Sequence, residues 1–486
     1  MQVDALEKGA KVVLHEVISL RNSLRPVNRL HPEIIVLCAA FVSDADPKPI
    51  VSLTHVCRYW RRSIVSDPRS WASISDGWKQ MIPLCLERAG ALPLTVYISE
   101  SRIEGDRDFL RVLLPHISRA SHISLMGYSS VEKVADSLPG FFASPMPNLT
   151  SLELEQTEGP AESFPSNETP APQLFQNISK ITSLHLTRIP LYVAVLSITS
   201  LVQLKLVGYT VPFDFGRFIG FLCSNLALEL VILDFRFSED SVSIAPERIA
   251  SLPQLRSLAF TCGSATDARR LISCMSLPRG ARIEIQGSYY NPCANLASFL
   301  PCPLEPIQQL LTPITAIKDQ TSPRWLRMFG SDGLLSFRSR HTPSEMFDEF
   351  NLFVTGAVRE FHVNIHRSDF GDGLLSRPLE RLPALEVLVL SGMSLSPGSL
   401  SVLAKEPVLC PSLKTIAFFD YGVTNCVISE LEKVLVERRN SSAARLHRVV
   451  IVNNTRPLPV LQSIHWLRRF IPRVDVGVGD ELPYLL

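Results

Sequence analysis

The stretch Leu149-Thr-Ser-Leu-Glu-Leu154, "LTSLEL", sets the pattern for most of this 486-residue chain. The same order, apolar-x-x-apolar-x-apolar, returns as "ITSLHL" over Ile181–Leu186 and as "LVQLKL" over Leu201–Leu206. Such alternation is typical of a strand with one buried face. Further copies start at Ala120, Leu230, Leu255, Leu385 and Leu413, and weaker ones start near Gly280, Val358 and Leu446. The sequence therefore predicts an α/β array of repeats that continues to the C-terminus.

The copies recur at roughly the 20–29-residue period of leucine-rich repeats. In such an array each unit supplies a strand with inward Leu or Phe and a helix or loop that covers it. Residues 218–223, 266–275 and 427–437 have the helical spacing expected of covering segments. The regular asparagine of an ideal repeat is missing, so the solenoid should be irregular. Residues 289–342 contain no clean copy and are expected to link two sub-arrays.

The residue between the two inward positions of each strand should point to the exposed face of the sheet. On this ground we expect an unknown client protein to bind at Glu153, His185, Lys205, Asp234 and Glu284. The mixed charges of this set fit a protein better than a nucleic acid, which needs clustered Lys and Arg. Residues 155–173 are polar and proline-rich, and we expect them to form a mobile loop.

The N-terminal region has helical rather than alternating spacing. Apolar residues over residues 4–24 predict an amphipathic helix that ends before Pro26. Pro32 fits the first turn of a second helix, where a missing N–H costs nothing. Apolar residues from Ile50 to Ile64 predict one further helix, ended by Asp67-Pro68.

Three segments of this region together resemble the F-box motif. They are Leu30-x-Pro32-Glu33-Ile34, Leu53-x-x-Val56-Cys57-Arg58-x-Trp60-Arg61 and Asp67-Pro68-x-x-Trp71. His31 departs from the motif, which usually has proline there. With the repeats, the whole chain resembles the divergent F-box and leucine-rich-repeat proteins of fungi.

This resemblance implies that the protein recruits a client to a ubiquitin ligase, by binding a Skp-type adaptor and through it a cullin. The adaptor contacts that it implies are Leu30, Pro32, Ile34, Ile35, Leu53, Val56 and Cys57, with Trp60 and Trp71 packing the bundle. Three alternatives stay open from the sequence. The seven residues could be ordinary bundle core, and the chain could be an interaction scaffold that joins no ligase. It could also be an enzyme whose motifs are not recognisable.

The resulting organisation is an N-terminal helix over residues 1–26, an all-α F-box bundle over 27–80 and a leucine-rich-repeat solenoid over 90–486. The net charge of +1 excludes a general attraction to nucleic acid or an anionic membrane. The 10 cysteines show no metal-binding spacing, and no catalytic motif or cofactor signature occurs. We therefore expect a non-enzymatic protein without metal or cofactor. No membrane span or secretory leader is evident, so an intracellular, cytoplasmic or nuclear location is expected.

Overall fold

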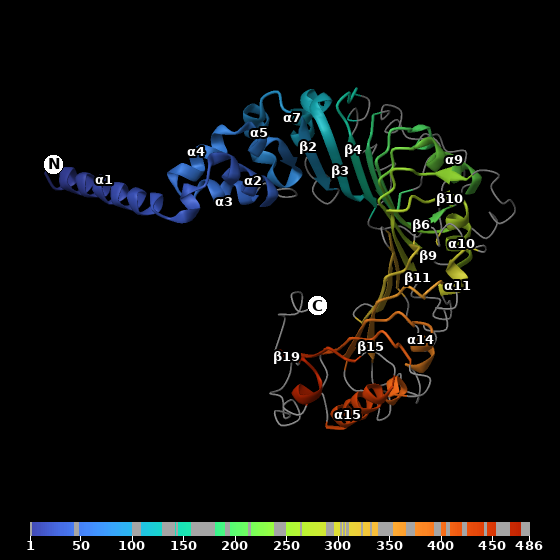
Figure 1. Ribbon diagram of the computed structural model, residues 1–486. Helices are drawn as coiled ribbons and strands as arrows, with labels where there is room; N and C mark the ends of the chain where they lie inside the picture. The colour runs from blue at the N-terminus through green and yellow to red at the C-terminus, as the bar shows by residue number, and fades with distance from the viewer. Residues whose placement is uncertain are drawn as a thin grey trace. The chain divides into compact units, whose positions relative to one another are not determined.

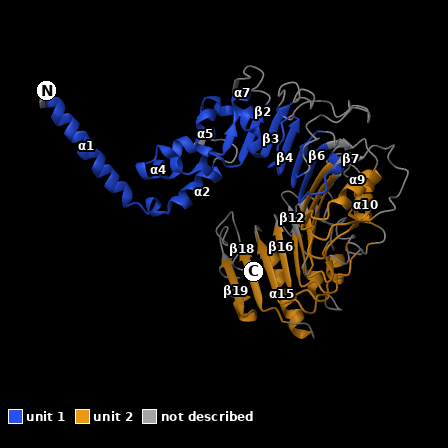
Figure 2. Ribbon diagram, turned by 90° about the horizontal axis from the view of Figure 1, so that it is seen from above, with its two compact units in different colours: residues 1–213 blue, residues 214–486 orange. Residues whose placement is uncertain are grey.

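The computed structural model divides the chain into two compact units, Met1–Phe213 and Asp214–Leu486 (Figure 2). It describes residues 2–42, 48–99, 108–128, 141, 144–156, 180–189, 195–211, 215–237, 249–262, 265–287, 296–301, 304, 307, 311–321, 324–330, 333–338, 353–365, 375–392, 400–404, 409–419, 425–441, 445–452 and 467–477. The predicted loop at 155–173 lies outside these residues, apart from Glu155 and Gln156.

Unit 1 begins with helices. In chain order they are α1 (Gln2–Ser23), η1 (Pro26–Arg29), α2 (Pro32–Val42), α3 (Lys48–Thr54), α4 (Arg58–Ser66), η2 (Pro68–Trp71), η3 (Asp76–Met81) and α5 (Ile82–Ala89). The helices α2, α3 and α4 pack together as a small bundle (Figure 1). Pro32 starts α2 as expected, because the first helical residue needs no N–H partner.

The helix predicted from Ile50 to Ile64 is in fact two helices, and the prediction of one helix is wrong. Cys57 separates α3 from α4 in an extended conformation, with φ −160° and ψ 173°. Its carbonyl accepts the first hydrogen bond of α4, from the N–H of Arg61 at 3.0 Å. Apolar spacing reports which side chains face a core, but it does not detect one extended residue between two short helices.

The sheet of unit 1 is parallel and follows chain order. Its strands are β1 (Ser73–Ser75), β2 (Leu94–Ser99), β3 (Ala120–Tyr128), β4 (Ser151–Gln156), β5 (Ser183–Thr187) and β6 (Gln203–Val211). The remaining helical segments are α7 (Asp108–Leu113), η4 (Leu114–Arg119) and η6 (Val195–Ser197). In β4 and β5 the repeat leucines are buried and the residues between them are half-buried. This confirms the alternation read from "LTSLEL".

Unit 2 contains the other strands and is also mostly parallel. Its main sheet contains β7 (Leu230–Phe237), β9 (Ser257–Cys262), β11 (Arg282–Gly287), β12 (Ala316–Thr321), β13 (Arg324–Phe329), β14 (Leu334–Arg338), β15 (Glu360–Ile365), β16 (Val387–Gly392), β17 (Thr415–Phe419), β18 (Arg448–Val452) and β19 (Arg473–Gly477). A short parallel pair joins β8 (Ala250–Ser251) to β10 (Met275–Ser276).

Unit 2 also contains helices, most of them between consecutive strands. They are α9 (Phe215–Ser224), α10 (Ala265–Ser273), α11 (Leu296–Phe299), α14 (Ser376–Glu380), η10 (Ser401–Ala404) and α15 (Asn425–Asn440). The helices predicted over 218–223, 266–275 and 427–437 are thus confirmed as α9, α10 and α15. Buried apolar residues of α9 and α10 face the unit core. No helix in the described ranges combines the length and the apolar character needed to cross a membrane.

The stretch over 289–342 contains three strands that the sequence pattern missed. The strand β13 runs antiparallel to both β12 and β14, whereas β14 is parallel to β11 and β12 is parallel to β15. The stretch therefore links the repeats on either side of it. A reversed strand cannot keep the one-strand-per-repeat pattern, and for this reason no clean copy was visible.

The repeat copy in β7 is shifted by two residues from the predicted one. Val231 aligns with Leu258 and Leu233 aligns with Phe260, so the copy is Leu228-x-x-Val231-x-Leu233. Leu228, Val231 and Leu233 are all buried, whereas Leu230 is only half-buried. The region "LALELVIL" offers leucine in both frames, and only strand pairing selects one. The true frame places Leu201, Leu228 and Leu255 at equal steps along the chain.

Candidate interaction surfaces

The first candidate surface is an apolar stripe along α2. Leu30 is 37% exposed, Ile34 is 44% exposed and Phe41 is 87% exposed. Leu37 lies between them and is 57% exposed, and Cys38 is exposed beside it. Ile34, Leu37 and Phe41 follow one another at steps of three and four and therefore lie on one side of α2, and Leu30 lies just before the helix begins. We call Leu30, Ile34, Leu37 and Phe41 the α2 stripe.

The opposite side of α2 faces the bundle core. Ile35, Val36 and Ala39 are buried there, and Ile64 of α4 is fully buried as well. Ile35 has no exposed surface, so the implication that it contacts an adaptor directly is corrected. It holds α2 on the bundle instead, because its position is one residue out of phase with the exposed Ile34.

The remaining predicted contacts gather at the junction of α3 and α4. Val56 is 53% exposed, Leu53 and Cys57 are half-buried, and Pro32 is exposed at the start of α2. A cavity of about 530 Å³ opens beside this junction, lined by residues of the junction and of the last turns of α1. Its lining includes Val56, Cys57 and Tyr59.

A polar side chain fixes the chain where it enters α2. The Oδ1 atom of Asn28 accepts a hydrogen bond from the indole N–H of Trp60 at 2.7 Å, and the Tyr59 hydroxyl donates to the Leu30 carbonyl at 2.7 Å. Trp71 is buried and donates its indole N–H to the Ile64 carbonyl at 3.0 Å. Both tryptophans therefore pack the bundle, as expected. These hydrogen bonds satisfy the two indole N–H groups and the Tyr59 hydroxyl in the bundle that carries the α2 stripe.

The second candidate surface is a polar row across the unit 1 sheet. Strand register places Tyr97, Ser124, Glu153, His185 and Lys205 opposite one another on β2 to β6. We call these five residues the unit 1 row. Three of them are predicted client contacts, and the structure brings those three together on adjacent strands.

Glu153 is the centre of this row. Its carboxylate lies 2.6 Å from Nδ1 of His185 and accepts a hydrogen bond from the Ser124 hydroxyl at 3.0 Å. The hydrogen bond with His185 outweighs the effect of burial and lowers the pKa of Glu153 to about 2. The carboxylate is therefore ionised at every physiological pH.

A neighbouring row adds aromatic and hydroxyl groups. The ring of Tyr97 lies 5.5 Å from that of His122, and Nδ1 of His122 is 2.8 Å from the Ser151 hydroxyl oxygen. The unit 1 row thus offers donors, acceptors and rings within a few residues. Within the row itself the carboxylate of Glu153 lies between the serine and the histidine, whereas in the neighbouring row His122 lies directly against Ser151.

Tyr97 and Ser124 were not among the predicted contacts, although a signal for each exists. Ser124 occupies the residue between Ile123 and Leu125 in the copy that starts at Ala120. Tyr97 occupies the same place between Val96 and Ile98 in β2, both of which are buried. Counting β2 as a further repeat would have found it.

The other two predicted client contacts lie in unit 2 and are not in one row. Glu284 aligns with Ala259 and Ser336. Asp234 aligns with Thr261, two residues further along its strand, because the β7 copy is shifted. The residue that takes the expected place in β7 is Ile232, opposite Ala259. Asp234 therefore lies on the expected outward face but not in the row of Glu284.

The same face of the unit 2 sheet is polar on β12 and β15 and apolar on β16 to β18. The Lys318 Nζ atom lies 2.9 Å from the Glu360 carboxylate, which also bonds to His362. The bond from His362 is the main cause that lowers the pKa of Glu360 to about 2. Val389 on the adjacent strand is aligned with His362. An apolar cluster begins at Val389.

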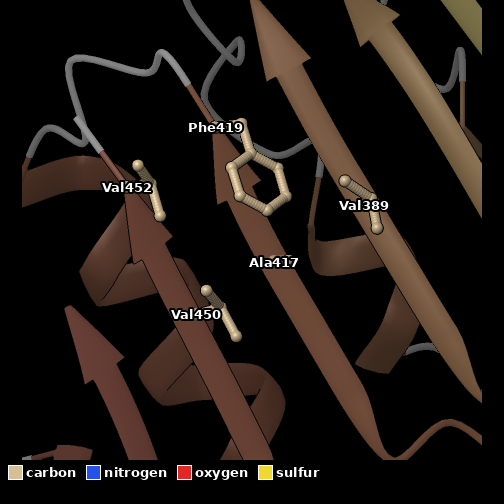
Figure 3. Close-up of a cluster of buried hydrophobic side chains, with 5 residues drawn as sticks. All are labelled: Val389, Ala417, Phe419, Val450 and Val452. Carbon is tan, nitrogen blue, oxygen red and sulfur yellow. The ribbon is translucent and has the colours of Figure 1, made fainter. Parts of the chain in front are cut away.

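This cluster occupies positions that were expected to lie on the exposed face of the sheet. Figure 3 shows Val389, Ala417, Phe419, Val450 and Val452 on β16, β17 and β18, all of them buried. They alternate with the repeat residues, so both faces of these three strands are apolar and buried. This part of the sheet belongs to the core, and it is not an open binding face.

The described residues contain no group of three or more His, Cys, Asp or Glu side chains placed to hold a metal ion. The six cysteines described in detail are free thiols. Burial raises the pKa of Cys85 to about 11 and that of Cys410 to about 12. These two thiols therefore stay protonated near neutral pH.

No protein-family model matches the chain, and the search of curated proteins finds no match. A solved structure of a leucine-rich-repeat protein from Leptospira interrogans is similar at 11% identity. The match covers 79% of this chain and 89% of that chain, with a TM-score of 0.28. The mixed α/β repeat architecture described above follows from the strand pairing within the chain itself.

Proposed function

We propose that this protein is a substrate receptor of a Skp/cullin/F-box-type ubiquitin ligase. The observation that supports this proposal is the α2 stripe, an exposed apolar surface on a small bundle that also carries the F-box-like residues. Exposed apolar area costs about 25 cal/mol per Å² relative to burial, so a contiguous stripe favours a partner. A helix in a groove is a common way to bury such a stripe.

The proposed adaptor contacts are the exposed and half-buried members of the predicted set, with two additions. They are Leu30, Pro32, Ile34, Leu37, Phe41, Leu53, Val56 and Cys57. Ile35 stays in the bundle core. The bundle is too small to bury these residues against itself, which is why they remain available.

The unit 1 row is the proposed client-binding surface, on a repeat array of the leucine-rich type. The row mixes a carboxylate, an imidazole, an ammonium group and a phenol, and this mixture fits a protein surface with complementary polar groups. The protein would act by proximity. It holds the client near a transfer machine that supplies the chemistry, so the chain needs no catalytic residue of its own.

The test is co-purification of the full chain with a Skp-type adaptor. Replacing Ile34 and Leu37 together by Asp should abolish adaptor binding, because two charges in an apolar interface lose their hydration without gaining a partner. The matched control replaces Leu226 and Ile249 by Asp. These residues belong to unit 2 and are 56% and 66% exposed. The control should bind the adaptor as the wild type does.

Equal loss in both double variants, or no loss in either, would contradict the assignment of the α2 stripe. If the wild-type chain fails to bind any Skp-type adaptor yet still captures proteins, the chain is an interaction scaffold that joins no ligase. Thermal unfolding of all the variants identifies any that are misfolded.

A further inference from the structure

The helix α1 is 22 residues long, and residues 3–21 are all exposed. Its last turns line the cavity beside the α3–α4 junction, and its first turns extend away from the described elements of the bundle (Figure 1). A helix of this length gains little stability from propensity alone, and in proteins most of it comes from packing of an apolar face. The exposed apolar side chains of α1 therefore need a partner.

These side chains follow a seven-residue repeat. Val3, Leu6, Ala10, Val13, Val17 and Leu20 are separated by alternating steps of three and four, and Leu24 continues the series. Alternation of this kind gives a seam of period 3.5, which is characteristic of coiled coils. We call these seven residues the α1 seam. Six of the seven are valine or leucine between 58% and 76% exposed, namely Val3, Leu6, Val13, Val17, Leu20 and Leu24.

We propose that the α1 seam pairs with the α1 seam of a second copy of this chain in a parallel two-stranded coiled coil. The residue types support two parallel strands. The first core position is taken by Val3, Ala10, Val17 and Leu24, and the second by Leu6, Val13 and Leu20. Two of the four first positions are thus β-branched and two of the three second positions are leucine, which are the residue types that parallel dimers favour.

The flanking charges also fit a parallel dimer. In a parallel dimer, the residue just before a first core position, such as Glu16 before Val17, lies opposite a residue of the partner helix. That partner residue is the one numbered five higher. Glu16 then faces Arg21 of the second copy, and this pairing occurs twice by symmetry. Gly9 faces Leu14, and Gln2 faces Glu7, so no like charges meet. Antiparallel pairing that brings Glu16 opposite a second Glu16 also brings Glu7 opposite Arg21, so it includes a like-charge contact that the parallel arrangement avoids.

The rest of unit 1 leaves the seam free. The α1 residues that line the cavity beside the bundle are His15, Ile18, Ser19, Asn22 and Ser23. None of them belongs to the seam, so the seam is directed away from that cavity. The inference does not depend on the proposed function, because it uses no adaptor or client contact.

The test is sedimentation equilibrium of the full chain over a concentration series. The wild type should approach twice the 54.1 kDa chain mass as the concentration rises. Val13→Asp should weaken self-association by about tenfold or more, since it places two facing carboxylates in an apolar seam. Val12→Asp is the matched control: it adds the same charge at an adjacent valine, 55% against 60% exposed, outside the seam. It should leave the association constant within about twofold.

A charge exchange tests the orientation. Glu16→Arg and Arg21→Glu should each weaken the homodimer, and an equimolar mixture of the two variants should form a heterodimer, because every facing pair is then opposite in charge. A wild-type chain that stays monomeric throughout the series overturns the proposal. Equal effects of Val12→Asp and Val13→Asp overturn it too, and failure of the mixture to associate overturns the parallel orientation.

Discussion

Single residues decide how polar groups are held on the exposed face of the sheet. Glu153 is in contact with His185 and Ser124, and Glu360 is in contact with His362 and Lys318. In both cases hydrogen bonding to the carboxylate outweighs burial and lowers its pKa. Each of these glutamates, which the sequence shows only as a charged residue, is thus part of a hydrogen-bonded network in the folded protein.

The pKa of Glu153 predicts a pH dependence of stability. A carboxyl whose pKa is lowered on folding, here to about 2, stabilises the native state above its unfolded pKa near 4.5 and loses that contribution as the pH falls to about 2. Glu153→Gln should therefore be destabilising at neutral pH, and its difference from wild type should shrink between about pH 4.5 and 2. Urea unfolding midpoints over that range measure the difference. A constant difference would contradict the role given to His185.

Whole elements decide which face of the sheet is a surface. In unit 1 the alternation of buried leucine and half-buried polar residue holds on β4 and β5. On β16 to β18 the alternate positions are valine, alanine and phenylalanine, and both faces are buried. Two strands with the same repeat leucines can therefore differ completely in what their second face can bind.

Substitution in this cluster should show core behaviour. Val450→Thr keeps the shape of a side chain that has no exposed surface but adds a hydroxyl without a ready partner. It should lower the free energy of unfolding by about 1–3 kcal/mol. The control is Val476→Thr on the adjacent β19, where the side chain is 38% exposed and the change should cost less than about 0.5 kcal/mol. Chemical denaturation of both variants checks this, and equal costs would refute a buried second face.

At the scale of the whole molecule, the proposed function assigns two tasks to two separate surfaces of unit 1. The α2 stripe is apolar and belongs to the helical bundle, whereas the unit 1 row is polar and belongs to the sheet. Surfaces that share no residue should respond to mutation independently. This separation can be measured directly.

Lys205→Glu should reduce client capture in proximity labelling and leave adaptor binding unchanged, because it reverses a charge in the unit 1 row only. Arg217→Glu is its control, with the same change of charge at an exposed residue of the helix α9. It should leave the captured proteins unchanged. A captured set that is unaltered by Lys205→Glu would move client binding away from this row.

The sequence by itself determined the repeat strands, the covering helices and the first turn of α2. The reason is that each depends on local periodicity or on the chemistry of one proline. It also placed Glu153, His185 and Lys205 on one face, since alternation along a strand is a local property. Ile34 and Ile35 show the limit of this reasoning: both are apolar and adjacent, yet one is 44% exposed and the other fully buried.

The tertiary structure alone decided the frame of the β7 repeat, the reversal of β13 and the burial of both faces of β16 to β18. Each of these depends on which strand lies next to which. In "LALELVIL" two frames are equally apolar, and the pairing of Val231 with Leu258 selects between them. Val450 alternates along its strand as Glu153 does, but whether such a position is solvated depends on neighbours distant in the chain.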